Sequence, residues 1–157
     1  MSERTVNHAT YTIERAYPAR PERVFRAFSD PAKKRRWYAE GERANVEEFT
    51  MDFRVGGRDR LVFSTPQGFQ CISESIYQDI RPNDRIVFAY TMRANGHCVS
   101  SSQGTFEFLP TADGTTLLFT EQAAFFEHAD GPEMRKEGWS DLLSQLGEEL
   151  ARPETAI

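Results

Sequence analysis

The spacing of apolar residues changes along this chain, and that change constrains the fold more than any other feature. In the middle of the chain, apolar residues recur at every second position, as in Phe49, Met51 and Phe53. Alternation of this kind predicts β-strands with one buried face. Near the C-terminus the spacing becomes helical, and a stripe of leucines follows Trp139. We therefore expect an antiparallel sheet followed by one long amphipathic helix.

Ahead of that sheet, the sequence predicts one strand and two short helices. Residues 9–17 alternate as a strand, and residues 21–28 have helical spacing with a proline in the first turn. Asp30 and Pro31 are typical of the start of a second helix, which we expect to end near Trp37 and Tyr38. The four consecutive cations at residues 33–36 resemble a binding patch, but we interpret them as the solvated end of this helix.

Turn residues separate the strands that follow. Asn95-Gly96 is the strongest hairpin signal, because both residues tolerate a positive φ. Strands are expected over residues 47–54, 58–64, 69–80, 85–92, 99–109 and 115–123, and the long helix over residues 133–150. The predicted fold class is α+β, with a curved antiparallel sheet of six to seven strands in a single domain over residues 1–157.

Composition excludes several classes of protein. The chain has 157 residues, the length of one typical domain, and 39% of them are hydrophobic. Lys and Arg number 19 against 24 Asp and Glu, a net charge of −5 that argues against a nucleic-acid partner. No apolar run is long enough for a membrane span, and the first residues do not resemble a signal peptide, so we expect a cytoplasmic protein. Cys71 and Cys98 are too few for a disulfide scaffold.

Five short motifs, in their order along the chain, resemble the SRPBCC (START/Bet v 1-like) superfamily. The similarity is greatest to the branch named after the activator of Hsp90 ATPase. It spans about residues 9–150 and implies the helix-grip fold and the binding of apolar small molecules. The motifs are Val24-Phe25-Arg26-Ala27-Phe28-Ser29-Asp30-Pro31 followed by Trp37-Tyr38, Asp52-Phe53-Arg54-Val55-Gly56-Gly57-Arg58, Ile80-Arg81-Pro82-Asn83-Asp84-Arg85-Ile86-Val87-Phe88, Gly114-Thr115-Thr116-Leu117 and Gly138-Trp139.

A curved sheet crossed by a single helix predicts an apolar cavity between the two, since one helix cannot fill the whole concave face. We expect a ligand in that cavity, with a few polar groups to orient it. The apolar lining is predicted to be Phe63, Phe88, Tyr90, Phe106 and Phe108 from strands and Trp139, Leu142, Leu143 and Leu146 from the helix. The polar groups are predicted to be Asp59, Ser73, Tyr77 and Glu121.

Two carboxylates in this set have alternative placements. Asp59 departs from the family pattern, and its parity with Leu61 points it inward, where it would need a partner or a raised pKa. The alternative is a solvated position at the strand edge. Glu121 shares parity with Phe119 and would reach the cavity mouth, and its alternative is an exposed strand end.

The facing of the strand at residues 69–80 is also open. Ser73, Ser75 and Tyr77 share one face, and Ile72 and Ile76 share the other. We place the serine face inward because small residues leave room for a ligand, although hydrophobicity favours the isoleucine face equally.

No pattern of residues indicates catalysis, a metal or a cofactor. Ser100–Ser102 lack the context of a nucleophile, and the three histidines are widely separated. The leading hypothesis is the binding of a hydrophobic or amphipathic small molecule. One alternative is a cyclase or hydrolase that uses Asp59 or Glu121 as general base, and another is a co-chaperone-like interaction module. The sequence leaves a homodimer open.

Overall fold

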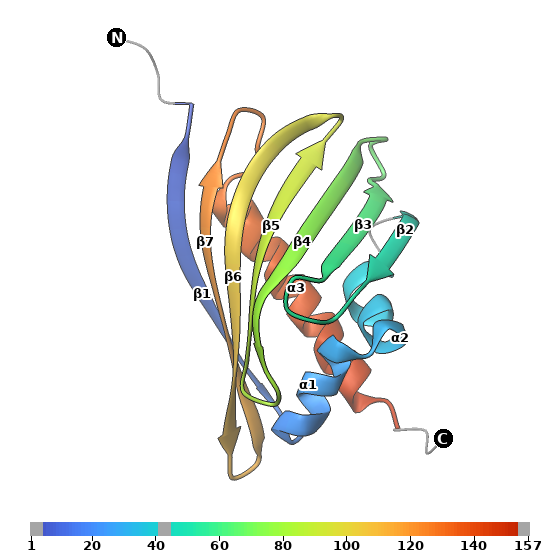
Figure 1. The fold of residues 1–157 in the computed structure, drawn as a ribbon, viewed down its shortest axis with the longest axis vertical. Helices are drawn as coiled ribbons and strands as arrows, with labels where there is room; N and C mark the ends of the chain where they lie inside the picture. Colours follow the sequence, from blue (N-terminus) through green and yellow to red (C-terminus); the bar gives the residue numbers. More distant parts are fainter. Residues whose placement is uncertain (1–4, 41–44, 154–157) are drawn as a thin grey trace.

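A computed structural model describes residues 5–40 and 45–153. Seven strands form one antiparallel sheet in the order β1-β7-β6-β5-β4-β3-β2 (Figure 1). The strands are β1 (Asn7–Tyr17), β2 (Asn45–Met51), β3 (Arg58–Ser64), β4 (Gln70–Arg81), β5 (Arg85–Ala94), β6 (His97–Thr111) and β7 (Gly114–Phe125). The helices are α1 (Pro21–Ser29), α2 (Pro31–Lys34), a π-helical turn η1 (Arg35–Ala39) and α3 (Pro132–Ala151).

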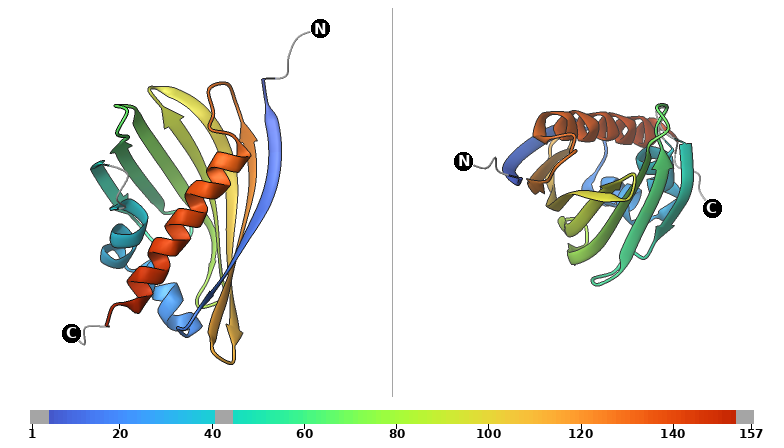
Figure 2. Two further views of the ribbon diagram at one scale, coloured as in Figure 1. Left: turned by 180° about the vertical axis from the view of Figure 1, so that it is seen from behind. Right: turned by 90° about the horizontal axis from the view of Figure 1, so that it is seen from above.

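The sheet curves around α3, which runs diagonally across its concave face (Figure 2). The stripe predicted on this helix is buried against the sheet at Trp139, Leu143, Leu146 and Leu150. The predicted α+β helix-grip architecture is therefore confirmed, with seven strands. No helix in the described ranges combines the length and apolar character that crossing a membrane would require.

Local sequence signals explain where several elements begin and end. The side chain of Asp30 accepts hydrogen bonds from the backbone N–H groups of Ala32 and Lys33, and so caps α2 as its position before Pro31 predicts. Asn95 and Gly96 have φ of 48° and 84°, the positive values that a tight hairpin between β5 and β6 requires.

Strand β2 ends earlier than expected. It stops at Met51 rather than residue 54, because the chain turns sharply before β3. The N–H of Gly57 donates to the carbonyl of Arg54 at 2.7 Å, and a Cβ on Gly57 would lie 2.1 Å from the carbonyl oxygen of Asp52. This turn takes Phe53 out of the strand and packs it against the core, in edge contact with Tyr77.

Aromatic rings fill the space between the sheet and α3. Phe106 stacks between Phe88 and Phe119, with ring centroids 5.6 and 4.6 Å away, and Trp139 covers them from the helix. Gly104 leaves the space that the ring of Phe88 occupies in this stack, because a Cβ at residue 104 would lie only 2.4 Å from that ring. The aromatic content of the sequence is thus concentrated in the layer beneath α3.

Candidate functional site

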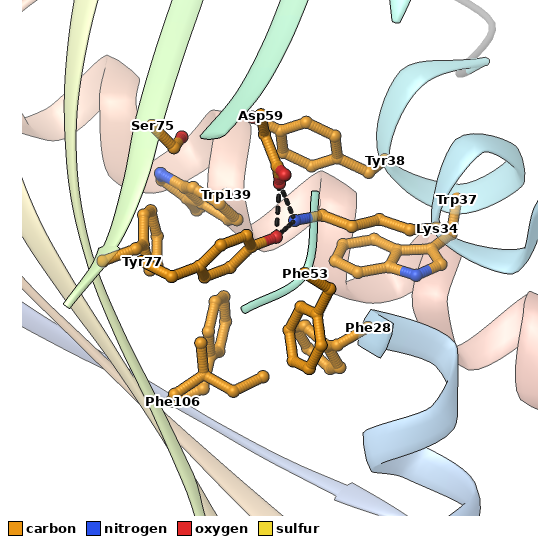
Figure 3. Close-up of a pocket in the computed structure, with 12 residues that line it drawn as sticks. Phe28, Lys34, Trp37, Tyr38, Phe53, Asp59, Ser75, Tyr77, Phe106 and Trp139 are labelled. Atoms are coloured by element: carbon orange, nitrogen blue, oxygen red, sulfur yellow. Dashed lines mark hydrogen bonds and ion pairs between the residues drawn. The ribbon is translucent and has the colours of Figure 1, made fainter. Parts of the chain in front are cut away.

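A small cavity lies in the core, between the sheet, the α2–η1 segment and α3. It is lined by Phe28, Lys34, Trp37, Tyr38, Phe53, Asp59, Ser75, Tyr77, Ile86, Phe88, Phe106 and Trp139 (Figure 3). Its volume is about 10 Å³, which is room for about one water molecule. A space therefore lies between the sheet and α3, but it is much smaller than the ligand-sized cavity that the sequence predicts.

A buried polar group lies within the aromatic lining. The ammonium of Lys34 donates to Oδ2 of Asp59 at 2.8 Å and to the hydroxyl of Tyr77 at 3.1 Å. The hydroxyl of Tyr77 donates to the same carboxylate oxygen. Lys34 reaches this position from the end of α2, while Asp59 comes from β3 and Tyr77 from β4 (Figure 3). Three separate elements therefore supply the cluster.

The second oxygen of the Asp59 carboxylate has no partner. Oδ1 accepts no hydrogen bond from the protein. It is buried, and the whole side chain is only 5% exposed. Leaving a buried acceptor without a donor is costly, so this atom sets Asp59 apart from most buried carboxylates, which are fully hydrogen-bonded. Burial and the adjacent Asp59 carboxylate raise the pKa of Tyr77, which keeps its hydroxyl protonated as a donor.

Two sequence interpretations are corrected here. Asp59 does not lie in water at a strand edge, since the residue is 4% exposed. Lys34 does not belong to a solvated helix end, since its side chain is 12% exposed and paired with Asp59. The physical reason is that η1, which continues α2, contacts the edge strand β2, so the aliphatic stem of Lys34 can reach over the rings of Tyr38 and Tyr77 and carry its charge to the buried carboxylate.

A second buried polar cluster surrounds Glu121 at the other side of Trp139. Oε1 of Glu121 accepts a hydrogen bond from Tyr90 at 2.7 Å, and Oε2 accepts one from Ser102 at 3.2 Å. The guanidinium of Arg135, from α3, lies 3.7 Å from Oε2 and donates to Tyr90. Arg135 also donates to Ser100 of β6 at 2.9 Å, so α3 is tied to the sheet at this end, and it forms a two-point ion pair with Asp130 in the loop before the helix.

Glu121 is fully buried, which corrects the interpretation of an exposed strand end. Burial raises its pKa, although the hydrogen bond from Tyr90 and the charge of Arg135 oppose this. A raised carboxylate pKa is what a general base would show, but Glu121 does not line the cavity. Trp139 connects the two regions, because it lines the cavity and its Nε1–H donates to the hydroxyl of Tyr90 at 3.2 Å.

The structure brings five predicted site residues to the cavity and places the others nearby or outside it. Asp59, Tyr77, Phe88, Phe106 and Trp139 line it. Of the rest, Ser73, Tyr90, Phe108, Glu121, Leu143 and Leu146 are buried without lining it, and Leu142 is half-buried against the core. Phe63 is half-buried outside the core cluster, so its alternation with Asp59 does not carry it to the cavity.

Ser73, Ser75 and Tyr77 are all buried, which settles the facing of β4 as we placed it. Tyr77 directs its hydroxyl toward Lys34 and Asp59.

Sequence reasoning missed several lining residues, above all Lys34, Trp37 and Tyr38. Their spacing puts them on one face of a helical segment, and that pattern could have revealed a lysine among aromatic neighbours. Arg135, the partner of Glu121, carried no such signal. Within the part of the chain that the structure describes, no group of three His, Cys, Asp or Glu side chains is placed to hold a metal ion.

Comparison with known proteins agrees with this architecture. The model of the activator of Hsp90 ATPase homolog 1-like (AHSA1) family matches residues 18–151. The chain belongs to this family. A search of curated proteins found no match for this AHSA1-family chain.

Solved structures extend the comparison of this AHSA1-family protein. An uncharacterized protein from Rhizobium leguminosarum is 35% identical, covers 97% of this chain and all of its own, and has a TM-score of 0.91. A protein from Rhizobium loti is 45% identical over 93% of this chain and 99% of its own, with a TM-score of 0.85. An AHSA1-like protein from Aeromonas hydrophila, at 19% identity and a TM-score of 0.69, shares the fold.

Proposed function

We propose that this protein binds a small hydrophobic or amphipathic molecule in the cavity between the sheet, the α2–η1 segment and α3. The observation that supports it is a buried ion pair inside a lining in which eight of twelve residues are aromatic. A buried ion pair adds little stability compared with apolar residues of the same volume. Its presence among aromatic rings is therefore better explained by recognition of a ligand than by folding.

Binding requires the closed cavity to expand, because about 10 Å³ admits only one water molecule. The segment suited to this movement is α2–η1, which contributes Lys34, Trp37 and Tyr38 to the lining. Helix α2 has four residues, and π-helical turns such as η1 occur frequently at functional sites. Arg36 holds this segment to α3 through a two-point ion pair with Glu149, so opening separates these two charges.

Both tryptophans of the chain, Trp37 and Trp139, line the cavity, so intrinsic fluorescence reports directly on its occupancy. The test is titration of the purified protein with fatty acids, flavonoids and aromatic alcohols, with thermal unfolding measured in parallel. We expect at least one compound class to change the emission saturably and to raise the unfolding midpoint. Native mass spectrometry of freshly purified protein would show the same one-to-one complex.

Two variants make this experiment specific to the cavity. Trp37→Phe leaves only Trp139 on α3 as a fluorescent reporter, and Trp139→Phe leaves only Trp37 on η1. Both variants should give the same apparent Kd for the ligand. Unchanged emission and unchanged unfolding midpoints across the whole panel would contradict the proposal.

A further inference from the structure

We infer that the molecule recognised here is a neutral aromatic compound with a hydroxyl or N–H group that donates a hydrogen bond to Oδ1 of Asp59. The inference rests on the proposed function and names the chemistry of the ligand. It is drawn from how the donors around the Asp59 carboxylate are distributed.

Both neighbouring donors use the same oxygen. The ammonium of Lys34 and the hydroxyl of Tyr77 bond to Oδ2, and Oδ1 is left buried without a partner. An ionised carboxylate accepts hydrogen bonds at both oxygens, so the unpartnered one calls for a further donor. Asp59 lines the cavity, so that donor can come from its occupant.

The surroundings define the rest of the ligand. Lys34 lies over the rings of Tyr38 and Tyr77, 4.9 and 5.5 Å from their centroids, so a positive charge is already present beside Asp59. A cationic ligand would be repelled by this ammonium, whereas a neutral donor would not. The remaining lining is dominated by phenylalanine and tryptophan rings, against which a planar aromatic body packs with offset or edge contacts.

A single water molecule is the competing partner of Oδ1, because the closed cavity has room for one. Water would satisfy the carboxylate without selecting any ligand. The two cases differ in whether ligand affinity depends on a donor group, and that difference can be measured.

The experiment compares naphthol, its methyl ether and naphthalene by isothermal titration calorimetry with the wild-type protein. A hydrogen bond to a charged acceptor predicts that naphthol binds at least about tenfold more tightly than the ether. Equal affinities for all three would overturn this inference while leaving the proposed function standing. Absence of binding by any of them, together with silence across the wider panel, would overturn both.

The variant Asp59→Asn supplies a second readout. Its amide oxygen must face Lys34 and Tyr77, which are both donors, so its NH₂ group occupies the position of Oδ1. The acceptor thereby becomes a donor, and we expect the preference for naphthol over its ether to shrink or reverse. Asp79→Asn is the control, since that carboxylate pairs with Arg85 at the surface and should leave the preference unchanged. An Asp59→Asn protein that keeps the wild-type preference would contradict the inference.

Discussion

Lys34 Nζ lies 2.8 Å from Oδ2 of Asp59, so the last residue of α2 and the second residue of β3 form an ion pair inside the aromatic core. Both side chains are mostly buried, at 12% and 5% exposure. Removing two charges from water costs more free energy than an isolated pair usually returns. The pair therefore makes specific predictions about stability that differ from those of a surface salt bridge.

Asp59→Leu should lower the free energy of unfolding by about 3–5 kcal/mol, because it leaves the Lys34 ammonium buried without a counter-charge. Lys34→Met combined with Asp59→Leu should recover most of that loss, since both charges are then gone. Urea unfolding of the wild type, the two single variants and the double variant measures the coupling. A double variant as unstable as the sum of the singles would show that the pair is not coupled.

Gly104→Ala should destabilise the protein by about 1–3 kcal/mol, the usual cost of overpacking a filled core. The added Cβ would lie 2.4 and 2.6 Å from ring atoms of Phe88, which is stacked on Phe106 and cannot move freely. Gly138→Ala is the matched control, because nothing lies within 4 Å of its added Cβ in α3. That variant should gain about 1 kcal/mol from helix propensity, and thermal unfolding measures both changes.

Glu121 predicts a pH dependence of stability. Burial raises its pKa in the folded state, so the folded protein binds this proton more tightly than the unfolded chain. Its contribution to stability is then fully present below the unfolded pKa of about 4.3 and is lost as the pH rises through the folded pKa. The unfolding free energy of the wild type minus that of Glu121→Gln should therefore decrease as the pH rises from 4, because only the wild type has this titrating group.

Glu47 is a control for this pH series, because its contribution to the unfolding free energy is expected to change with pH in the opposite direction. Hydrogen bonds from Gln70 and Ser64 lower its pKa, so its small contribution appears as the pH rises. Denaturant unfolding of Glu47→Gln at the same pH values should show a weak slope of the opposite direction. A difference between wild type and Glu121→Gln that grows with pH would contradict the assignment.

Phe53→Ala should speed the association of ligands with the cavity. Phe53 is half-buried in the turn between β2 and β3, lines the cavity and packs edge-on against Tyr77. Its truncation enlarges the closed cavity and lowers the barrier to entry, which stopped-flow tryptophan fluorescence measures. Phe63→Ala is the comparison, since Phe63 is also half-buried but does not line the cavity. Equal rates in the two variants would place the entrance elsewhere.

Several site residues were accessible to sequence reasoning because their placement follows from local alternation. Asp59 shares parity with Leu61, and Tyr77 shares parity with Ser73 and Ser75, so alternation offered an inward position for each. A solvated strand edge for Asp59 and the opposite facing of β4 stayed open until the structure showed all of these residues buried. Phe63 shows where this reasoning fails. It keeps its parity with Asp59, because β3 pairs with β4 in unbroken register, but it is the second-to-last residue of the strand and lies outside the core cluster.

The order and kind of the elements were determined by the sequence itself, because periodicity, proline positions and turn residues act over a few neighbouring residues. The pairings of Lys34 with Asp59 and of Arg135 with Glu121 were decided only by the tertiary structure. Each joins segments far apart in the chain, and no local pattern encodes which charge meets which. The cavity volume also belongs to the tertiary structure, since about 10 Å³ is the small remainder left when many large side chains pack together.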